Sequence, residues 1–182
     1  MTLEHSAFHI DGYEVRASGD GRTIDVLAVP FDAPTNIGRY VETFKRGSFS
    51  KTIADGKPER VKLFAQHEDQ KALPLGAAKR LEERSDGLHG SFRISRTRAG
   101  DEVLALIEDG ALDSVSIGFI PVRSDWTQDR KAVQRREVKL MEVSLVAYPA
   151  YQEAKVLALR EQQEPGTCGM SLDTARRLAQ MI

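Results

Sequence analysis

Two serines at alternate positions are the hydroxyl groups in this chain that could act as nucleophiles. Ser114 and Ser116 lie in the run 113–119, in which each serine is followed by an apolar residue. Alternate residues of a strand share a face, so both hydroxyls would point one way and their apolar neighbours the other. Gly118 removes a side chain beside Ser116, where a substrate backbone could approach. Taken alone, the pattern is more typical of two small polar residues on a solvated strand face.

A serine nucleophile needs a general base within hydrogen-bond reach and a third group that orients this base. Among the four histidines, His67 comes just after the predicted strand 60–65, separated from it by Gln66 alone, where a strand would deliver its side chains to a rim. A lone histidine at such a position is more often a solvated loop residue, here beside Glu68 and Asp69, and the functional interpretation is a general base. The other histidines occupy positions that favour no catalytic role: His5, His9 and His89.

Glu142 is the carboxylate with the most unusual surroundings. It interrupts the run 140–146, which is otherwise almost wholly apolar, and a buried carboxylate is costly unless it is paired. One interpretation is a strand with a polar face that carries Glu142 and Ser144. The other is a carboxylate that is aimed at His67, holds its tautomer and balances the imidazolium that forms during catalysis.

Signatures of other chemistries are missing from the sequence. There is no G-x-S-x-G elbow, no H-E-x-x-H, no Walker-type phosphate loop and no G-x-G-x-x-G. The triplet 67–69 has no second histidine or cysteine at ligand spacing, so we expect neither a metal nor a cofactor. The charged run 129–136 is interpreted as a solvated loop and strand edge.

The totals favour one soluble intracellular domain. The 182 residues carry a formal net charge of −1, which argues against a specific nucleic-acid partner. No apolar run approaches the roughly 18 residues of a membrane span, so we expect no membrane association. The single cysteine, Cys168, excludes an internal disulfide.

The elements that must position these residues are mostly strands. Strands are predicted at 23–29, 40–44, 60–65, 115–123, 133–140 and 142–147, and a hairpin at 75–94 is centred on Asp86-Gly87. Thr97 is expected to cap a helix at 98–109, and a shorter helix is expected at 48–54. We predict three parts: a poorly patterned segment 1–21, a β-rich α+β domain 22–160, and a linker with a short amphipathic helix at 161–182.

In combination, several stretches make the chain resemble the prohead (capsid maturation) protease family of tailed phages. They run in order through residues 22–160: 29–42, 47–49, 63–69, 73–76, 86–88, Ser114-Val115-Ser116-Ile117-Gly118-Phe119, and 142–151. The last two motifs, at this separation, carry most of the resemblance. It implies a serine endopeptidase with a fold similar to the herpesvirus assemblins, a β-barrel surrounded by a few helices.

By this resemblance Ser116 matches the nucleophile and His67 the general base, and Glu142 is the third member that we choose. The sequence departs from the family pattern at two places. Glu68 intervenes between His67 and the acidic residue that commonly follows it, which leaves Asp69 as an alternative third member. Val115 stands where the family commonly has methionine before the nucleophile.

The resemblance also implies the partners and the location. The expected substrates are the scaffolding segment of the major capsid protein and the protease itself, cut inside the assembled prohead in the host cytoplasm. Further copies of the chain in a homo-oligomer complete the expected partners. For the oxyanion we suggest help from an arginine-bearing loop at Arg123 or Arg135-Arg136. The alternative function is a non-catalytic capsid-assembly or scaffolding module with the same fold.

Overall fold

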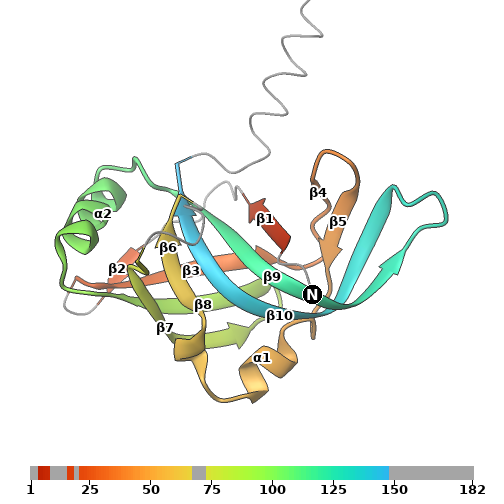
Figure 1. Cartoon of the computed structure of the whole chain (residues 1–182), viewed down its shortest axis with the longest axis horizontal. Helices are drawn as coiled ribbons and strands as arrows, with labels where there is room; N and C mark the ends of the chain where they lie inside the picture. Colours follow the sequence, from red (N-terminus) through yellow and green to blue (C-terminus); the bar gives the residue numbers. More distant parts are fainter. Residues whose placement is uncertain (1–3, 9–15, 19–20, 67–72, 148–182) are drawn as a thin grey trace, which may run out of the picture.

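One curled sheet organises the molecule. A computed structural model describes residues 4–8, 16–18, 21–66 and 73–147. Within these residues ten strands form one sheet, eight of them in the order β1-β9-β10-β6-β7-β8-β3-β2, and the other two, β5 and β4, lie off this path, with β5 paired to β10 and β4 paired to β5. Figure 1 shows the sheet curled into a half-barrel, with α1 on one side and α2 at one end. The predicted β-rich fold with few helices is confirmed.

The described elements follow one another as short strands, two helices and a long final hairpin. The strands are β1 (Glu4–Phe8), β2 (Arg16–Ser18), β3 (Thr23–Pro30), β4 (Thr35–Asn36), β5 (Val41–Phe44), β6 (Lys62–Ala65), β7 (Gly76–Glu83), β8 (Gly87–Ile94), β9 (Ser114–Trp126) and β10 (Ala132–Val146). The helices are α1 (Ser50–Ala54), the single 3-10 turn η1 (Pro58–Arg60) and α2 (Arg98–Glu108).

Local signals in the sequence account for the hairpin β7–β8 and for the start of α2. The turn before Gly87 is closed by the backbone N–H of Arg84, which donates to the carbonyl of Gly87 at 2.8 Å. At the start of α2 the Thr97 hydroxyl accepts a hydrogen bond from the backbone N–H of Gly100 at 3.1 Å, as an N-cap residue does. Both predictions are therefore confirmed.

Two predictions about the strands need correction. Residues 1–21 contain β1 and β2, which are too short to show a periodic pattern in the sequence. The predicted strands 133–140 and 142–147 are one continuous strand, β10, because the irregularity at Glu142 is a β-bulge and not a break. The predicted helix within 161–182 lies outside the described residues. In the part of the chain that the structure describes, neither helix is long and apolar enough to cross the membrane.

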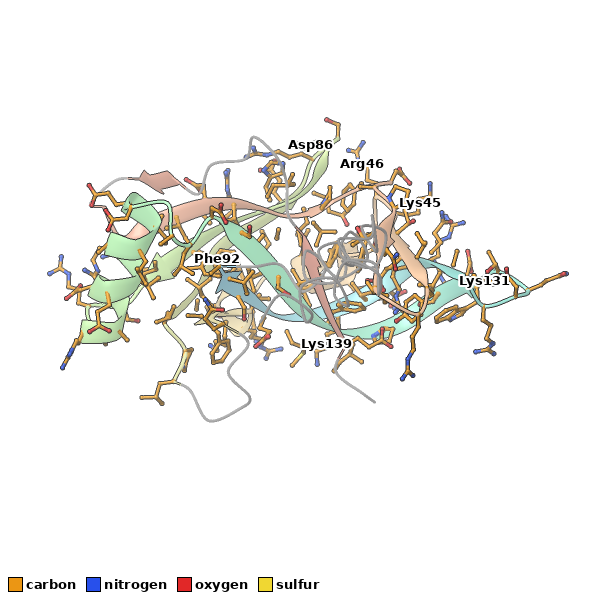
Figure 2. All side chains as sticks on the ribbon, turned by 90° about the horizontal axis from the view of Figure 1, so that it is seen from above. Lys45, Arg46, Asp86, Phe92, Lys131 and Lys139 are labelled. Atoms are coloured by element: carbon orange, nitrogen blue, oxygen red, sulfur yellow. The ribbon has the colours of Figure 1, made fainter. Side chains whose placement is uncertain are left out.

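The core lies inside the curl of the sheet and draws side chains from most of the strands. Phe92 on β8 and Phe119 on β9 are fully buried, and Phe44 and Phe119 meet edge to face at 5.3 Å between ring centroids. Figure 2, which draws all described side chains, shows charged residues such as Asp86 and Lys131 at the turns. This core fixes β9 and β10, the two strands that carry the candidate site.

A buried arginine joins three strands at the other end of β9 and β10. The Nε of Arg135 on β10 donates to Glu42 on β5 at 2.6 Å, and its guanidinium also pairs with Glu4 on β1. Further bonds reach Ser124 at 3.1 Å and the Tyr40 hydroxyl at 3.4 Å. Burial, with Glu4 and Glu42 nearby, raises the pKa of the Tyr40 phenol, so the phenol stays neutral at physiological pH.

Replacing Arg135 by methionine is expected to lower the free energy of unfolding by about 3–5 kcal/mol, because Glu42 then remains buried without its cation. A loss of this size lowers the Tm by about 6–20 °C in a chain of this length. Thermal unfolding followed by circular dichroism measures the shift.

Arg136 provides the matched control for this prediction. It is the next residue on the same strand, and its Nε pairs with Asp125 at 2.7 Å, but both side chains are substantially exposed. Arg136→Met should therefore cost only about 0–1 kcal/mol. Equal shifts for the two variants would contradict the structural importance of the buried cluster, whereas adding Glu42→Gln to Arg135→Met should recover part of the loss.

Candidate active site

Ser116 lies on β9, with a strand on each side. Its partner on β10 is Ser144 and its partner on β1 is Ala7, both in antiparallel register. Ser116 is fully buried, and Ser114 is buried as well, with its hydroxyl donating to the Asp113 carboxylate at 2.8 Å. The solvated strand face that was one interpretation of the two serines is therefore wrong.

Glu142 reaches the face of Ser116 because of a bulge in β10. Leu140 pairs with Phe119, and Glu142 pairs with Gly118, so Met141 is an extra residue in β10. Without this extra residue Glu142 would pair with Ile117 and point to the core face, because a shift of one residue exchanges the two faces of a strand. The bulge is thus what turns this carboxylate toward the candidate nucleophile.

Gly118 has a different purpose from the one the sequence suggests. A Cβ atom on Gly118 would lie 2.6 Å from Cγ and 2.9 Å from Oε1 of Glu142. Real Cβ atoms essentially never approach other atoms this closely. The space beside Ser116 is therefore filled by the Glu142 side chain, and the glycine is needed for that carboxylate rather than as open room for a substrate.

The strand β6 leads to the position of His67. It runs parallel to β10, with Phe64 beside Ser144 and Ala65 beside Leu145. The backbone N–H of Gln66 donates to the carbonyl of Leu145 at 2.8 Å, and Gln66 has a φ of +56°, which turns the chain out of the strand. Adjacent strands are about 4.8 Å apart, so Gln66 lies two strands, or about 10 Å, from β9. His67 and Asp69 themselves lie outside the described residues.

Ser144 is a further hydroxyl at the site that the sequence did not single out as functional. It is fully buried between Ser116 and Phe64, and within the described residues its Oγ has no hydrogen-bond partner. A buried hydroxyl without a partner is unfavourable. The only signal in the sequence was its position two residues after Glu142, on the same strand face.

The arginines suggested for the oxyanion lie far from Ser116. Arg135 is opposite Ser124 on β9, about 26 Å along the strand from Ser116, and it is engaged by Glu42 and Glu4. Arg123 is opposite Glu137 in the same distal part of the hairpin. The register of β9 and β10 separates these residues from the serine, so this suggestion is wrong.

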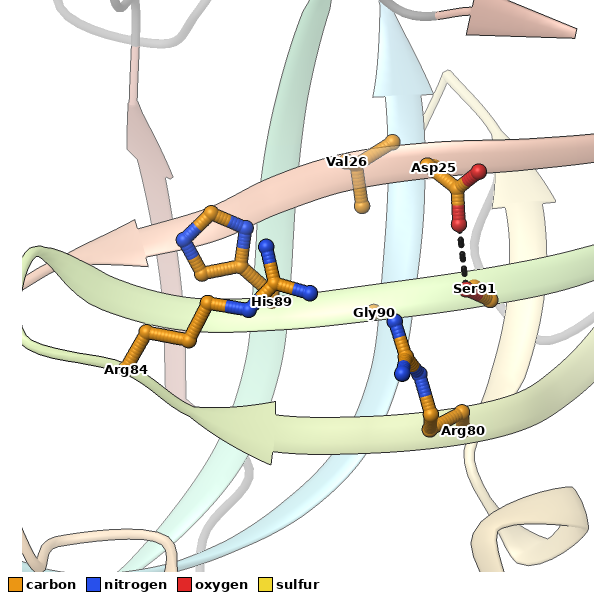
Figure 3. Close-up of a pocket in the computed structure, with 7 residues that line it drawn as sticks. All are labelled: Asp25, Val26, Arg80, Arg84, His89, Gly90 and Ser91. Atoms are coloured by element: carbon orange, nitrogen blue, oxygen red, sulfur yellow. Dashed lines mark hydrogen bonds between the residues drawn. The ribbon is translucent and has the colours of Figure 1, made fainter.

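A pocket elsewhere on the molecule does not include the candidate site. It has a volume of about 270 Å³, lies over β3, β7 and β8, and is lined by Arg80, Arg84, His89 and Asp25 among others. Figure 3 shows the Asp25–Ser91 contact across it. Glu82 pairs with Arg84 at 3.2 Å, and Asp86 lies 2.9 Å from the His89 ring. Each charged or ionisable side chain that lines the pocket therefore already has a side-chain partner nearby. Among the described residues no group of three or more histidine, cysteine, aspartate or glutamate side chains is placed to hold a metal ion.

The arrangement brings a hydroxyl and a carboxylate to one face of adjacent strands. Glu142 is diagonal to Ser116 across the β9–β10 pair, and such diagonal neighbours are about 7–8 Å apart. The end of β6 lies near this pair, because Ala65 is beside Leu145, the residue after the Ser144 that faces Ser116. A hydroxyl that is hydrogen-bonded to an imidazole, which is in turn oriented by a carboxylate, is the arrangement used in acyl-transfer catalysis.

Comparisons with known proteins point in the same direction. The family model described as caudovirus prohead serine protease matches residues 11–167. Among solved structures the chain is similar to the capsid assembly protease gp21 of bacteriophage T4, with a TM-score of 0.59 and 13% sequence identity. The similarity covers 81% of this chain and 98% of the T4 chain, and at this identity it concerns the fold. No curated protein matches the sequence.

Proposed function

Since the chain belongs to the caudovirus prohead serine protease family, we propose that Ser116 is its nucleophile, His67 its general base and Glu142 the carboxylate that orients His67. The observation that carries this proposal is the bulge in β10. It places Glu142 on the same strand face as Ser116, two residues along β10 from the position opposite the serine.

In this proposal His67 takes the proton of the Ser116 hydroxyl while the serine oxygen attacks the carbonyl carbon of a peptide bond. Collapse of the tetrahedral intermediate breaks the C–N bond, and His67 returns the proton to the leaving amine. Water, activated by the same imidazole, then cleaves the acyl ester and restores the serine. Glu142 stabilises the imidazolium in both halves of the reaction, with Asp69 as the alternative residue for this role.

The substrates that we propose are the scaffolding segment of the major capsid protein and the protease chain itself. Support comes from the family description, which names the prohead, and from the T4 neighbour, which is named a capsid assembly protease. The enzyme would act inside the assembled prohead in the host cytoplasm, with other copies of the chain enclosed beside it. Residues 161–182 would serve as a self-cleaved or shell-docking tail.

Co-expression with the capsid protein tests the choice of substrate. Particles assembled with the wild-type chain should contain capsid protein shortened at one end, and mass spectrometry of the two fragments identifies the bond. Particles assembled with Ser116→Ala should contain the full-length capsid protein. Equal capsid-protein masses in both kinds of particle would instead favour the non-catalytic assembly module.

Gly118→Ala is expected to reduce the rate of peptide cleavage by about 10²-fold, although the new methyl group touches no reacting atom. The added Cβ would displace the Glu142 side chain, and misplacement of a catalytic group by about 1 Å costs this much. Steady-state kinetics on a fluorogenic peptide that spans the mapped cleavage site measure the change.

A second substitution separates displacement of the carboxylate from general damage to β9. Glu142→Ala removes Cγ and the carboxylate that the new methyl group would strike, so Gly118→Ala should cause no further loss of rate in a Glu142→Ala background. Ser114→Ala, on the same face of β9, is the control for a small change in this strand. Wild-type activity of Gly118→Ala would show that the position of Glu142 over Gly118 is irrelevant to catalysis.

A further inference from the structure

The strand β1 occupies the edge of β9 at the candidate nucleophile. Glu4 to Phe8 pair antiparallel with residues 119 to 115, which places Ala7 directly opposite Ser116. β10 covers the other edge of this part of β9, and β1 is the last strand of the sheet on this side, as Figure 1 shows. Removal of β1 would therefore leave an open strand edge beside Ser116.

An open edge at this position is suited to bind an extended peptide. Peptides are commonly recognised by addition of a strand to a sheet edge, where main-chain hydrogen bonds supply affinity. Directly opposite residues of an antiparallel pair have Cα atoms about 4.5–5.5 Å apart, so a peptide in this register presents its backbone to the serine face. In the described structure β1 holds that place, and Ser116 has no exposed surface.

One side chain of β1 is attached to the buried arginine cluster. Glu4 pairs with the guanidinium of Arg135, and the Glu4 side chain is 33% exposed, whereas those of Arg135 and Glu42 are at most 2% exposed. If Glu4 leaves, Arg135 keeps its 2.6 Å bond to Glu42, so no buried charge is left without a partner. The attachment can therefore open without disrupting the sheet behind it.

We propose that β1 is an autoinhibitory strand, which occupies the substrate position on the edge of β9 and is fastened there by the Glu4–Arg135 ion pair. The proposal rests on the proposed role of Ser116. A short strand with pairing on one side opens at low cost compared with the core strands. Entry of a capsid-protein segment in extended form would then displace β1 and bring a substrate backbone beside the nucleophile in its place.

The test compares the full chain with Ser6→Pro/Ala7→Pro. Successive residues of an antiparallel strand face the partner alternately, so one of the two prolines removes an N–H that faces β9. Two measurements are made on each protein. Hydrogen exchange reports the amides of residues 115–119, and a rhodamine fluorophosphonate, from which an activated serine oxygen displaces fluoride, reports access to Ser116.

The double-proline variant should exchange faster at 115–119 and react with the fluorophosphonate about tenfold faster, as when a site open one-tenth of the time becomes fully open. Glu4→Gln should give an increase of about two- to fivefold, in line with a partly exposed ion pair. A synthetic peptide with the sequence of residues 1–12 should slow the reaction of the double-proline variant again. Asp125→Asn, which removes an exposed carboxylate from β9, should change neither measurement.

Faster exchange with an unchanged or slower fluorophosphonate reaction would overturn the proposal, because β1 would then cover β9 without blocking Ser116. Unchanged exchange in the double-proline variant would overturn it as well, since β1 would not protect this edge. A cooperative thermal transition in each variant excludes general unfolding as the cause of either result. Fluorophosphonate labelling that persists in Ser116→Ala would instead refute the assignment of the nucleophile, whatever β1 does.

Discussion

Replacing Ser116 by alanine is expected to reduce the rate of peptide cleavage by about 10⁵–10⁶-fold, the largest effect of any single substitution in this chain. Without the serine oxygen no acyl-enzyme can form, and only substrate binding and oxyanion stabilisation still contribute to the rate. The missing oxygen comes from a small, fully buried side chain, so the fold should persist. Quantitative mass spectrometry of the cleaved peptide over several days detects so large a reduction.

Ser114→Ala is the matched control, since Ser114 is buried on the same face of β9 and differs in its partner, the Asp113 carboxylate. It should retain cleavage within a few-fold of the wild type. If Ser114→Ala abolishes cleavage and Ser116→Ala does not, the nucleophile is Ser114. If neither does, the reaction does not use this face of β9.

Glu142→Gln is expected to reduce the rate by about 10⁴-fold, with little change in the KM for the peptide. An amide in this place keeps the shape of the side chain but cannot balance the imidazolium, and it can favour the wrong tautomer of His67. The same substitution leaves the contact with Gly118 in place, because glutamine and glutamate have the same length. Pre-steady-state and steady-state measurements with the fluorogenic peptide separate the acylation rate from binding.

Asp69→Asn provides the comparison that ranks the two candidates for the third member. It should remain within about tenfold of the wild-type rate if Glu142 orients His67. If Asp69→Asn loses most of its cleavage rate and Glu142→Gln keeps its rate, the residue that orients His67 is Asp69 and not Glu142. Equal and moderate losses would indicate that both carboxylates support the imidazole.

Much of the fold could be predicted because its signals are local. The turn at Asp86-Gly87 and the cap at Thr97 depend on residues within a few positions of each other, and both occur as predicted. β1 could not be predicted, since it is short and is held by a distant strand, β9, whereas β2 pairs with the next strand in the chain, β3, and was missed because it has only three residues. The cluster of Arg135, Glu42 and Glu4 was missed because its ion pairs join residues 93 and 131 positions apart.

The sequence by itself determined the residue types of the site and the family to which they point. It could place Ser116 and Ser114 on one strand face and Glu142 in an apolar strand, because these relations follow from the two-residue repeat of a strand. It could not distinguish a strand break at Glu142 from an extra residue within one strand.

Only the tertiary structure decided which way Glu142 points, because the answer depends on the pairing of β10 with β9. One extra residue at Met141 exchanges the faces and moves the carboxylate from the side of Ile117 to that of Ser116. The same pairing showed that Gly118 makes room for Glu142, and the pairing of β1 with β9 showed that β1 covers the edge next to the serine. Register between strands distant in sequence leaves no local pattern, and in this protein it arranges the site.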